Sequence, residues 1–292
     1  MKLLVVGHRG QVARALAERA RGKAGLELTA LGRPGLDLAT PGSAAAAITG
    51  SDADVVINAA AFTAVDSAED EPALADRING EAAGEVAAAA LGIGAPVIQI
   101  STDYVFDGRS RRPYRPGDPP HPLGAYGRSK LAGEEAVRAS NPGHFILRTA
   151  WVISPFGPNF VTTMLRLAGE REEIAVVDDQ IGSPTSALEF ADGVLAAAQA
   201  ASAGVGLGRT YHLAGAGQCS WAELAAEAFD ISRKHGGPWA TVRPIPSSDY
   251  PVRAERPAYS VLDNHAFEAE FGVTMPPWQR SLEPIVARLL AS

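Results

Sequence analysis

Tyr126 and Lys130 stand four residues apart in the string AYGRSK, a spacing that could form a proton-transfer pair. On a helix, positions i and i+4 share a face, so both side chains could serve one pocket. A free tyrosine has a pKa near ~10, and a neighbouring ammonium group would lower that pKa and make the phenol a better proton donor. Such a phenol could protonate a ketone oxygen while a nicotinamide cofactor supplies a hydride to the carbon. Spacing alone does not separate this pair from two polar residues on the outside of a helix.

Two further side chains stand where strands are expected to end. Thr102 follows the apolar run APVIQIS, and its hydroxyl could donate a hydrogen bond to the same ketone oxygen. Trp151 comes after the apolar run HFILRTA and could form a surface that contacts substrate. Ligands of doubly wound sheets bind at the carboxyl ends of the strands, where both residues fall. The alternatives are an ordinary strand-end hydroxyl and a core tryptophan.

The string VVGHRGQVA joins the first expected strand to the first expected helix, as a nucleotide-binding turn does. Gly7 could form the sharp turn, and Gly10 would let the backbone approach a phosphate at the helix N-terminus. Ala13 replaces the third glycine of the usual pattern, so an ordinary strand–turn–helix connection is the alternative.

The second expected strand ends at LTALGRPG, which contains Arg33 and no adjacent carboxylate. An acidic residue there would hold a ribose 2′-hydroxyl, whereas an arginine favours a 2′-phosphate. Arg33, together with Arg9 in the glycine turn, therefore predicts NADPH as the cofactor, with NADH as the alternative. Asp37 follows later and could meet the adenine side of the cofactor.

The elements that must position these residues follow an alternating order. Apolar segments predict strands, and segments rich in helix-favouring residues lie between several of them. Strands are expected within 3–7, 26–31, 53–61, 95–106, 144–154, 173–179 and 210–214, and helices within 11–23, 72–91 and 127–140. The alternation predicts an α/β fold, a doubly wound parallel sheet of Rossmann-like type with right-handed crossovers.

Proline-rich stretches depart from this order. Residues 107–123 predict a long loop with solvated arginines, and the proline-rich C-terminal part predicts a smaller substrate-binding lobe. We expect residues 1–150 plus about 186–214 to form an NAD(P)-binding Rossmann domain. Residues of about 151–185 and 215–292 would then form the substrate-binding lobe.

Composition excludes several classes of protein. The formal net charge of −7 gives no electrostatic case for binding nucleic acid or an anionic membrane surface. The single cysteine, Cys219, excludes an internal disulfide and fits a reducing compartment. The opening MKLLVVGHRG reads as a first strand rather than a signal peptide, and no apolar run approaches the ~20 residues that span a bilayer. We therefore expect a cytoplasmic protein.

Longer strings narrow the interpretation beyond the tyrosine–lysine pair. The glycine turn and Tyr126-x-x-x-Lys130 resemble the extended short-chain dehydrogenase/reductases. Several strings resemble the dTDP-4-dehydrorhamnose reductase family, in family order along nearly the whole chain: NAAAFTAVDSAE (58–69), STDYVFDG (101–108), PLGAYGRSKLAGE (122–134), RTAWV (148–152), DDQIGSPTSA (178–187), YHLAGAGQCSWAELA (211–225) and RPAYSVLD (256–263).

This resemblance implies an activity and a set of site residues. The activity is NADPH-dependent reduction of dTDP-4-dehydro-β-L-rhamnose to dTDP-β-L-rhamnose, in dTDP-rhamnose biosynthesis. The implied catalytic residues are Tyr126, Lys130 and Thr102. The implied cofactor-binding residues are Gly7, Gly10, Gln11, Val12, Arg33, Asp37, Leu38, Ala61, Phe62, Thr63, Ile100, Tyr126 and Lys130. The implied substrate-binding residues are Thr102, Asp103, Tyr104, Trp151 and Arg256.

The resemblance also raises a metal, a partner and two alternatives. The family is associated with Mg²⁺ at a subunit contact, and Glu189 matches one acidic position, but the C-terminus VARLLAS offers no further carboxylate. We therefore expect no metal site, and we expect Glu189 to be exposed on a helix. A homodimer is the candidate assembly. The alternative functions are reduction of another nucleotide 4-ketosugar and a non-catalytic NADP-binding subunit, as in the β-subunit of methionine adenosyltransferase.

Overall fold

The computed structural model describes residues 1–291, and its centre is a six-stranded, all-parallel sheet. The strand order is β10-β5-β4-β3-β1-β2. These strands are β1 (Lys2–Val6), β2 (Glu27–Leu31), β3 (Val55–Asn58), β4 (Val97–Thr102), β5 (His144–Thr149) and β10 (Arg209–His212). The doubly wound α/β fold expected from the sequence is confirmed, and each predicted segment of the sheet contains a strand.

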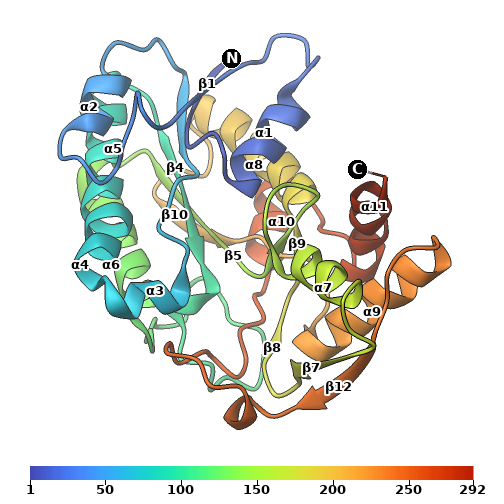
Figure 1. The fold of residues 1–292 in the computed structure, drawn as a ribbon. Coiled ribbons are helices and arrows are strands. Elements are labelled where there is room, and N and C mark those ends of the chain that lie inside the picture. The colour runs from blue at the N-terminus through green and yellow to red at the C-terminus, as the bar shows by residue number, and fades with distance from the viewer. Residues whose placement is uncertain (292) are drawn as a thin grey trace.

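Helices cover both faces of the sheet (Figure 1). One layer holds α1 (Gln11–Ala20) and α8 (Ala187–Ser202). The other holds α2 (Ser43–Ile48), α3 (Val65–Asp70), α4 (Pro72–Ala75), α5 (Ala82–Gly92) and α6 (Ala125–Ser140). A π-helix, η1 (Asp76–Glu81), joins α4 to α5, so the helix predicted over 72–91 contains an irregular turn. A π-helical turn within an α-helix is rare, and such turns are frequently found at functional sites.

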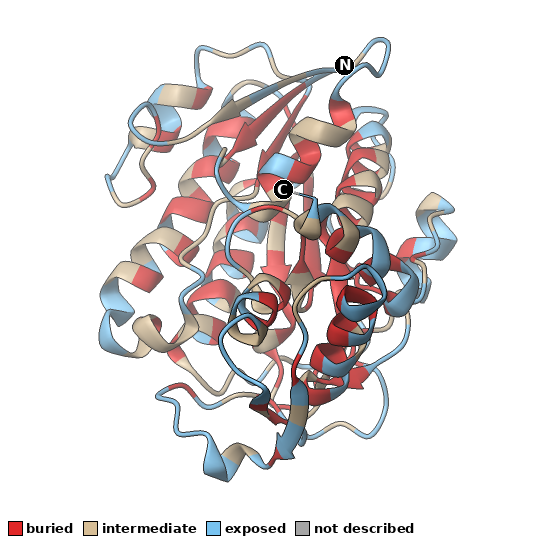
Figure 2. Ribbon diagram, turned by 45° about the vertical axis from the view of Figure 1, so that its right-hand side comes forward, coloured by how far each residue is buried: buried red, intermediate tan, exposed pale blue. Residues whose placement is uncertain are grey.

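The two layers exist because β1 is apolar on both faces. Side chains alternate across a strand, so Leu3 and Val5 enter the core beside α1 and α8, while Leu4 and Val6 enter the core beside α2 and α5. Figure 2 shows the buried residues gathered in the sheet and on the inner helix faces, with exposed residues on the connecting loops. Polar ligands must therefore bind where the strands end.

A second apolar core lies beside the carboxyl ends of the strands. Its helices are α7 (Phe160–Ala168), α9 (Trp221–Lys234) and α11 (Trp278–Leu290), and its short strand pairs use β6 (Val152–Ile153), β7 (Glu173–Val177), β8 (Ile181–Gly182), β9 (Thr185–Ser186), β11 (Cys219–Ser220) and β12 (Thr241–Ile245). The strand predicted within 173–179 is thus present but pairs with β12, outside the main sheet. The assignment of this part as a substrate-binding domain with the expected boundaries stays a prediction.

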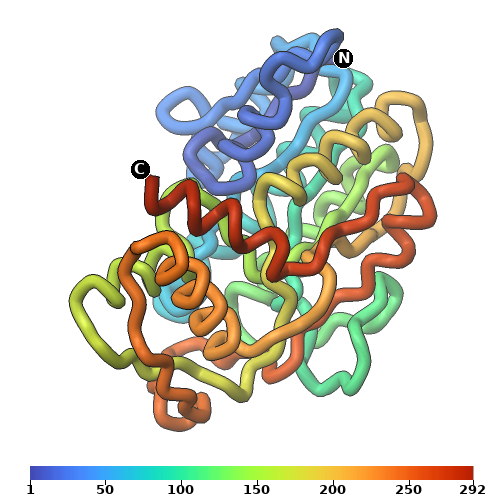
Figure 3. The backbone as a smooth tube through the Cα atoms, turned by 90° about the vertical axis from the view of Figure 1, so that its right-hand side faces the viewer, coloured from blue at the N-terminus to red at the C-terminus, as the bar shows by residue number. Residues whose placement is uncertain are grey.

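The C-terminal helix returns to the first helix of the chain. Figure 3 shows α11 running past α1, and Arg288 on α11 makes two hydrogen bonds of 2.8 Å to the carboxylate of Glu18 on α1. The remaining helix, α10 (His265–Phe271), packs near β10. Within residues 1–291, no helix is both long and apolar enough to cross a membrane.

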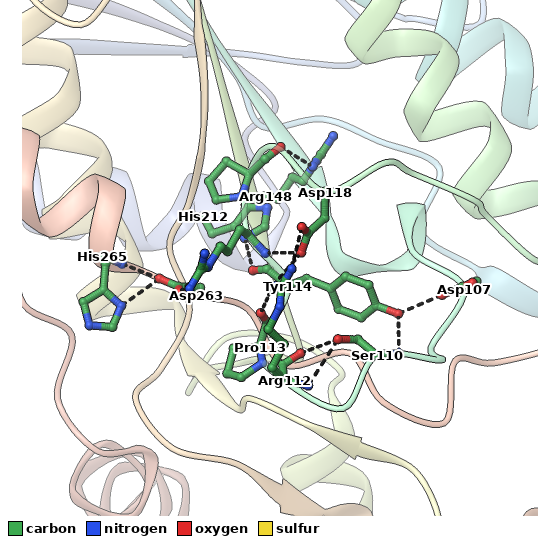
Figure 4. A network of polar contacts seen from close by, with 12 residues as sticks. Asp107, Ser110, Arg112, Pro113, Tyr114, Asp118, Arg148, His212, Asp263 and His265 are labelled. Carbon is green, nitrogen blue, oxygen red and sulfur yellow. Dashed lines mark hydrogen bonds and ion pairs between the residues drawn. The ribbon is translucent and has the colours of Figure 1, made fainter.

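The long loop predicted over 107–123 has no helix or strand of its own, but polar contacts anchor it (Figure 4). The carbonyl of Tyr114 lies 2.9 Å from Nδ1 of buried His212 on β10, and the Tyr114 ring stacks on Phe106 with centroids 4.1 Å apart. The predicted solvated arginines are partly correct, because exposed Arg112 also pairs with Asp118 at 2.9 Å. These contacts hold the loop beside β5 and β10.

Candidate functional site

The structure brings Thr102 and Tyr126 together at the carboxyl end of β4. Thr102 is the last residue of β4, and Tyr126 lies in the first turn of α6. Their hydroxyl groups lie close enough for the Thr102 hydroxyl to lower the pKa of Tyr126. The Tyr126 ring meets the edge of the Tyr104 ring, with centroids 5.6 Å apart and an interplanar angle of 75°. Two hydroxyl groups therefore converge on one point, where a ketone oxygen could accept from both.

The lowering of the Tyr126 pKa that the sequence predicts is not seen, because desolvation acts more strongly in the opposite direction. Burial raises the pKa of Tyr126 to about 12, and the nearby Thr102 hydroxyl opposes this shift. The ammonium of Lys130 is directed elsewhere, since its Nζ donates to the carbonyl of Ile100 at 2.7 Å. The phenol consequently holds its proton throughout the neutral pH range.

Lys130 is buried, and its pKa is lower than that of a free lysine. Its side chain is 4% exposed, and loss of solvation lowers its pKa to about 8, while the charge of Glu134 one helical turn further on raises it. One of its three ammonium hydrogens is used on Ile100, so two remain for a ligand beside the strand end. The i and i+4 placement of Tyr126 and Lys130 on α6 is as the spacing predicts.

Asp103 is buried at the same strand end, and only one of its two carboxylate oxygens has a hydrogen-bond donor among the described residues. Its Oδ1 accepts a hydrogen bond of 3.0 Å from Thr102, and its Oδ2 has no partner among the described residues. Burial raises the pKa of Asp103 to about 6, although the nearby hydroxyls of Ser260 and Thr102 lower it. A buried carboxylate oxygen without a donor is costly, and a ligand hydroxyl could supply the missing hydrogen bond.

The glycine turn has the shape that a phosphate site needs. Gly7 ends β1 with φ of +108°, and a Cβ there would stand 3.3 Å from the backbone of Ala59 and Ala60. Both the backbone angle and the space therefore require glycine. Gly10 is the N-cap of α1, and a Cβ on it would meet nothing within 4 Å. Its surroundings within the protein do not require a glycine, whereas a ligand against the helix N-terminus would.

The first two residues of α1, Gln11 and Val12, also make contacts within the protein. The Gln11 amide accepts from the Ser154 hydroxyl at 2.7 Å, and its nitrogen lies 3.4 Å from the carbonyl of Val152. Val12 is partly buried against the core beside α1 and α8. The side chains of Gln11 and Val12 are therefore occupied within the protein. A phosphate at the helix N-terminus would meet only their backbone N–H groups.

The two arginines that predict NADPH lie on neighbouring turns. Arg33 is exposed just after β2, and Arg9 is exposed in the glycine turn, with its Nε 3.2 Å from Nε2 of His8. A Cβ on Gly32 would stand 2.0 Å from the His8 ring, so the imidazole lies directly on the second turn. His8 therefore joins the glycine turn to the turn after β2. Two guanidinium groups thus flank the end of β1 and β2.

Asp37 and Leu38, which are also predicted to bind the cofactor, are less exposed than Arg9 and Arg33. Asp37 is partly buried, and its Oδ1 accepts from the backbone N–H of Ala39 at 3.0 Å. Leu38 is 6% exposed and belongs to the core beside α2. The Leu38 side chain serves packing, so any contact it makes with a cofactor would come from its backbone.

Asn79 is a positioning residue that sequence reasoning missed. It lies in the π-helix, and its amide brackets Phe62 by accepting from the Phe62 N–H at 2.8 Å and donating to the Phe62 carbonyl at 3.0 Å. The same amide donates to the Ser129 hydroxyl at 3.0 Å, next to Lys130. The predicted cofactor segment from Ala61 to Thr63 is thereby fixed against α6, and Phe62 packs in one apolar cluster with Tyr126.

Arg256 reaches the site from the far end of the chain. Its guanidinium pairs with Asp66 on α3 at 2.7 Å, and the nearby Tyr104 side chain contributes to the raised pKa of Arg256. It lines a hollow of about 400 Å³ together with Gln180, Ser247 and the segment 250–255. Tyr104 and Arg256 are therefore brought together as the substrate prediction requires, and the pKa of the Tyr104 phenol is raised by burial.

Trp151 lies at the junction with the second core. Its backbone has φ of +44°, and its indole stacks on Trp221 with centroids 3.4 Å apart and an interplanar angle of 4°. A Cβ on Gly182 would stand 2.3 Å from the same indole. Trp151 is only partly exposed. One face of the ring is covered by Trp221, so its role as a substrate contact stays a prediction.

The described residues do not fit a divalent cation. Residues 1–291 contain no cluster of three or more His, Cys, Asp and Glu side chains that could hold a metal ion. Glu189 is partly buried rather than exposed as predicted, because its carboxylate accepts from Ser281 on α11. Burial raises the pKa of Glu189, which works against a cation ligand.

The missed residues differ in how visible they are in the sequence. Glu134 follows Lys130 by one helical turn, and Asn79 lies in a string that matches no motif quoted for the site. Asp66 and Ser260 lie in strings quoted for the family resemblance, but nothing in those strings indicates that Asp66 meets Arg256 or that Ser260 lies near Asp103, because only the fold brings them together.

Comparison with known proteins agrees with this geometry. The family model described as RmlD substrate binding domain matches residues 1–291. The chain is 43% identical to dTDP-4-dehydrorhamnose reductase of Sinorhizobium fredii over 99% of this chain and 98% of that protein. It is 44% identical to the protein of the same name from Burkholderia thailandensis, with 100% of both chains covered.

Solved structures agree with the sequence comparison. A dTDP-4-dehydrorhamnose reductase from Clostridium acetobutylicum superposes with a TM-score of 0.92 at 37% identity, covering 100% of both chains. The enzyme of that name from Bacillus anthracis, solved in complex with NADP, superposes with a TM-score of 0.91 at 33% identity over 98% of both chains.

Proposed function

Because the chain belongs to the dTDP-4-dehydrorhamnose reductase family, we propose that it reduces the 4-keto group of dTDP-4-dehydro-β-L-rhamnose to give dTDP-β-L-rhamnose. The observation that carries this proposal is the placement of Thr102, Tyr126 and buried Lys130 at the end of β4, where α6 packs against that strand. A protein that only binds a dinucleotide has no need of a proton donor at this point.

Tyr126 is the proton donor of the proposed reaction. Its phenol is protonated at neutral pH, so it can give its proton to the ketone oxygen as that oxygen gains electrons. Thr102 donates a second hydrogen bond to the same oxygen and stabilises its developing negative charge. The Lys130 ammonium favours the tyrosinate that remains, and its two unused hydrogens can bind hydroxyls of the nicotinamide ribose.

The glycine turn and the two exposed arginines fit an NADPH molecule. NADPH, when bound, would supply the hydride that adds to the ketone carbon. Gly7, Gly10 and the N-terminus of α1 would hold its diphosphate, and Arg9 and Arg33 would flank the 2′-phosphate. The segment from Ala61 to Thr63 would line the dinucleotide beside α6. No carboxylate at the end of β2 repels the phosphate, so NADH serves as the weaker cofactor.

The substrate side of the site combines one carboxylate and one guanidinium. Asp103, whose Oδ2 has no partner among residues 1–291, would accept from a sugar hydroxyl. Arg256, beside Tyr104, would exchange Asp66 for the diphosphate of the nucleotide sugar, because a guanidinium binds two phosphate oxygens at once. Trp151 would contact the sugar with the part of its indole that Trp221 leaves uncovered.

Turnover of NADPH with dTDP-4-dehydrorhamnose tests the proposal. Loss of NADPH absorbance should depend on the sugar, and dTDP-rhamnose should appear in equal amount. A parallel reaction with other nucleotide 4-ketosugars tests whether one of them is the substrate. Faster turnover of one of these sugars would establish that alternative. Saturable NADPH binding without turnover of any sugar would establish the non-catalytic alternative. Sedimentation of the same sample, with and without Mg²⁺, would test the predicted homodimer and the predicted absence of a metal.

A further inference from the structure

Glu134 is a fully buried carboxylate whose four hydrogen bonds reach three different elements. Its Oε1 accepts from Ser101 Oγ on β4 at 2.7 Å and from Arg148 Nε on β5 at 2.8 Å. Its Oε2 accepts from Arg148 Nη2 at 2.7 Å and from Arg138 Nη2 on α6 at 2.9 Å. Glu134 is 0% exposed and Arg148 is 2% exposed. None of these groups takes part in the proposed chemistry.

The contacts of Glu134 fall directly behind the proton donor. Ser101 immediately precedes Thr102 on β4, and Ile100, which precedes Ser101, accepts the hydrogen bond from Lys130. Two side chains of α6, one helical turn apart, therefore grip two consecutive residues of β4 just before Thr102. The third side chain of this helix at the site, Tyr126, meets the Thr102 hydroxyl.

The adjacent strand belongs to the same arrangement. Ser101 pairs with Arg148, and Thr102 pairs with Thr149, across β4 and β5. Arg148 therefore links the Glu134 carboxylate to the neighbouring strand at the level of the residue before Thr102. Buried ion pairs of this kind often contribute little net stability, because desolvation offsets their attraction. Their directional hydrogen bonds nevertheless fix the relative position of the parts that they join.

We propose that Glu134 is a positioning residue that holds Thr102 in register with Tyr126 and Lys130 by clamping β4 to α6 through Ser101. This inference rests on the proposed function. Reaction rates are sensitive to such alignment, since a misplacement of about 1 Å can cost roughly 100-fold in rate. Glu134 touches neither the proposed substrate nor the proposed cofactor position, so its effect should fall on kcat rather than on KM.

The deciding variant is Ser101→Ala, which removes only the bond between β4 and Glu134 and leaves the Glu134–Arg148 pair in place. We expect kcat to fall about 10-fold, with the KM for sugar and the Kd for NADPH within about twofold of wild type. Glu134→Gln should lower kcat more, by about 10- to 100-fold, because it also weakens the grip on β5. Arg138→Met is the matched control, because Arg138 is partly exposed and binds the same carboxylate without touching β4.

A wild-type kcat in Ser101→Ala would overturn the inference, as would a fall in kcat equal to that of the Arg138→Met control. Thermal melts identify variants that have lost their fold, and Ser101→Ala decides if Glu134→Gln does not fold. A proportional rise in KM and in the NADPH Kd would also overturn the inference, because that pattern indicates general loosening. Failure of the proposed function itself would appear differently, as a wild-type protein that turns over no nucleotide 4-ketosugar.

Discussion

The proton-transfer residues and the substrate-side residues are held in different ways. Thr102, Tyr126 and Lys130 are fixed within one junction, α6 against the end of β4, by buried contacts between neighbouring elements. Trp151 and Arg256 are held by long-range contacts, with Trp221 and with Asp66, between segments that are distant in the chain. In the α6–β4 junction Thr102 and Lys130 are buried, whereas the Asp66 side chain is 44% exposed.

The two regions therefore have different tasks. The α6–β4 junction keeps the catalytic groups aligned, and the Arg256–Asp66 pair can be replaced by a ligand. Buried hydrogen bonds cost free energy to break, so the α6–β4 junction stays in one arrangement. A partly exposed ion pair contributes only about 0–1 kcal/mol, so Asp66 can yield Arg256 to a ligand phosphate. We therefore expect changes in the junction to affect kcat and changes in the long-range contacts of Trp151 and Arg256 to affect KM. Four predictions test this division, beginning with the largest effect.

Tyr126→Phe should lower kcat by about 10²- to 10⁴-fold, because it removes the proposed general acid and keeps the ring. NADPH binding should stay unchanged, since the glycine turn is remote from the phenol. Steady-state kinetics, NADPH titration and thermal melts make the comparison. A variant that keeps more than about a tenth of the wild-type kcat would remove Tyr126 from the mechanism.

Asp103→Asn should stabilise the protein at pH 8 and have much less effect at pH 4. Burial raises the pKa of Asp103 to about 6, above the value of ~3.9 in an unfolded chain. Between these values the native state binds more protons than the unfolded state, so this carboxyl makes stability fall as pH rises from about 4 through 6. The asparagine variant lacks that loss, which amounts to about 3 kcal/mol for a shift of this size.

Denaturant unfolding of wild type and Asp103→Asn across that pH range measures the difference. The stability gain should grow with pH while the KM for sugar rises, because the ligand loses an acceptor. A stability gain that is the same at pH 4 and pH 8 would show that the Asp103 carboxyl is not desolvated in the native state.

Trp221→Ala should raise the KM for sugar by about 2- to 10-fold, because aromatic pairs contribute about 0.5–1.5 kcal/mol beyond their buried area. Trp151→Ala should raise it at least as much, and neither change should alter the NADPH Kd. Trp239→Ala is the control, since Trp239 is 50% exposed beyond α9 and lies in neither region. Equal losses of sugar and NADPH affinity would mean that the Trp151–Trp221 stack only supports the fold.

Arg33→Ala should reduce the preference for NADPH over NADH in kcat/KM. We expect wild type to prefer NADPH by about 10-fold, as one partly exposed phosphate contact of ~1.4 kcal/mol would produce. The variant should lose most of that preference with little change in its NADH kinetics. Arg21→Ala, at the other end of α1, should keep it. A wild-type enzyme that prefers NADH would contradict the role given to Arg33.

The sequence by itself determined the sheet and the spacing of the chemical groups. Apolar runs predict the strands because a strand buried on both faces cannot alternate with polar residues, and Tyr126 and Lys130 share a face because helical geometry places i and i+4 together. It also located Thr102 and Gly7, since each follows directly from a strand end. It did not predict the pairing of β7 outside the main sheet or the partly buried state of Glu189.

Only the tertiary structure decided where the remaining charges and rings lie. Sequence spacing carries no information on Asp66 and Arg256, which are 190 residues apart, because their meeting depends on how the C-terminal segment crosses α3. The pKa values of Tyr126 and Lys130 likewise follow from burial, which removes water from both side chains and outweighs the expected effect of one on the other. Motifs specify which groups are present, and desolvation in the folded chain sets their protonation.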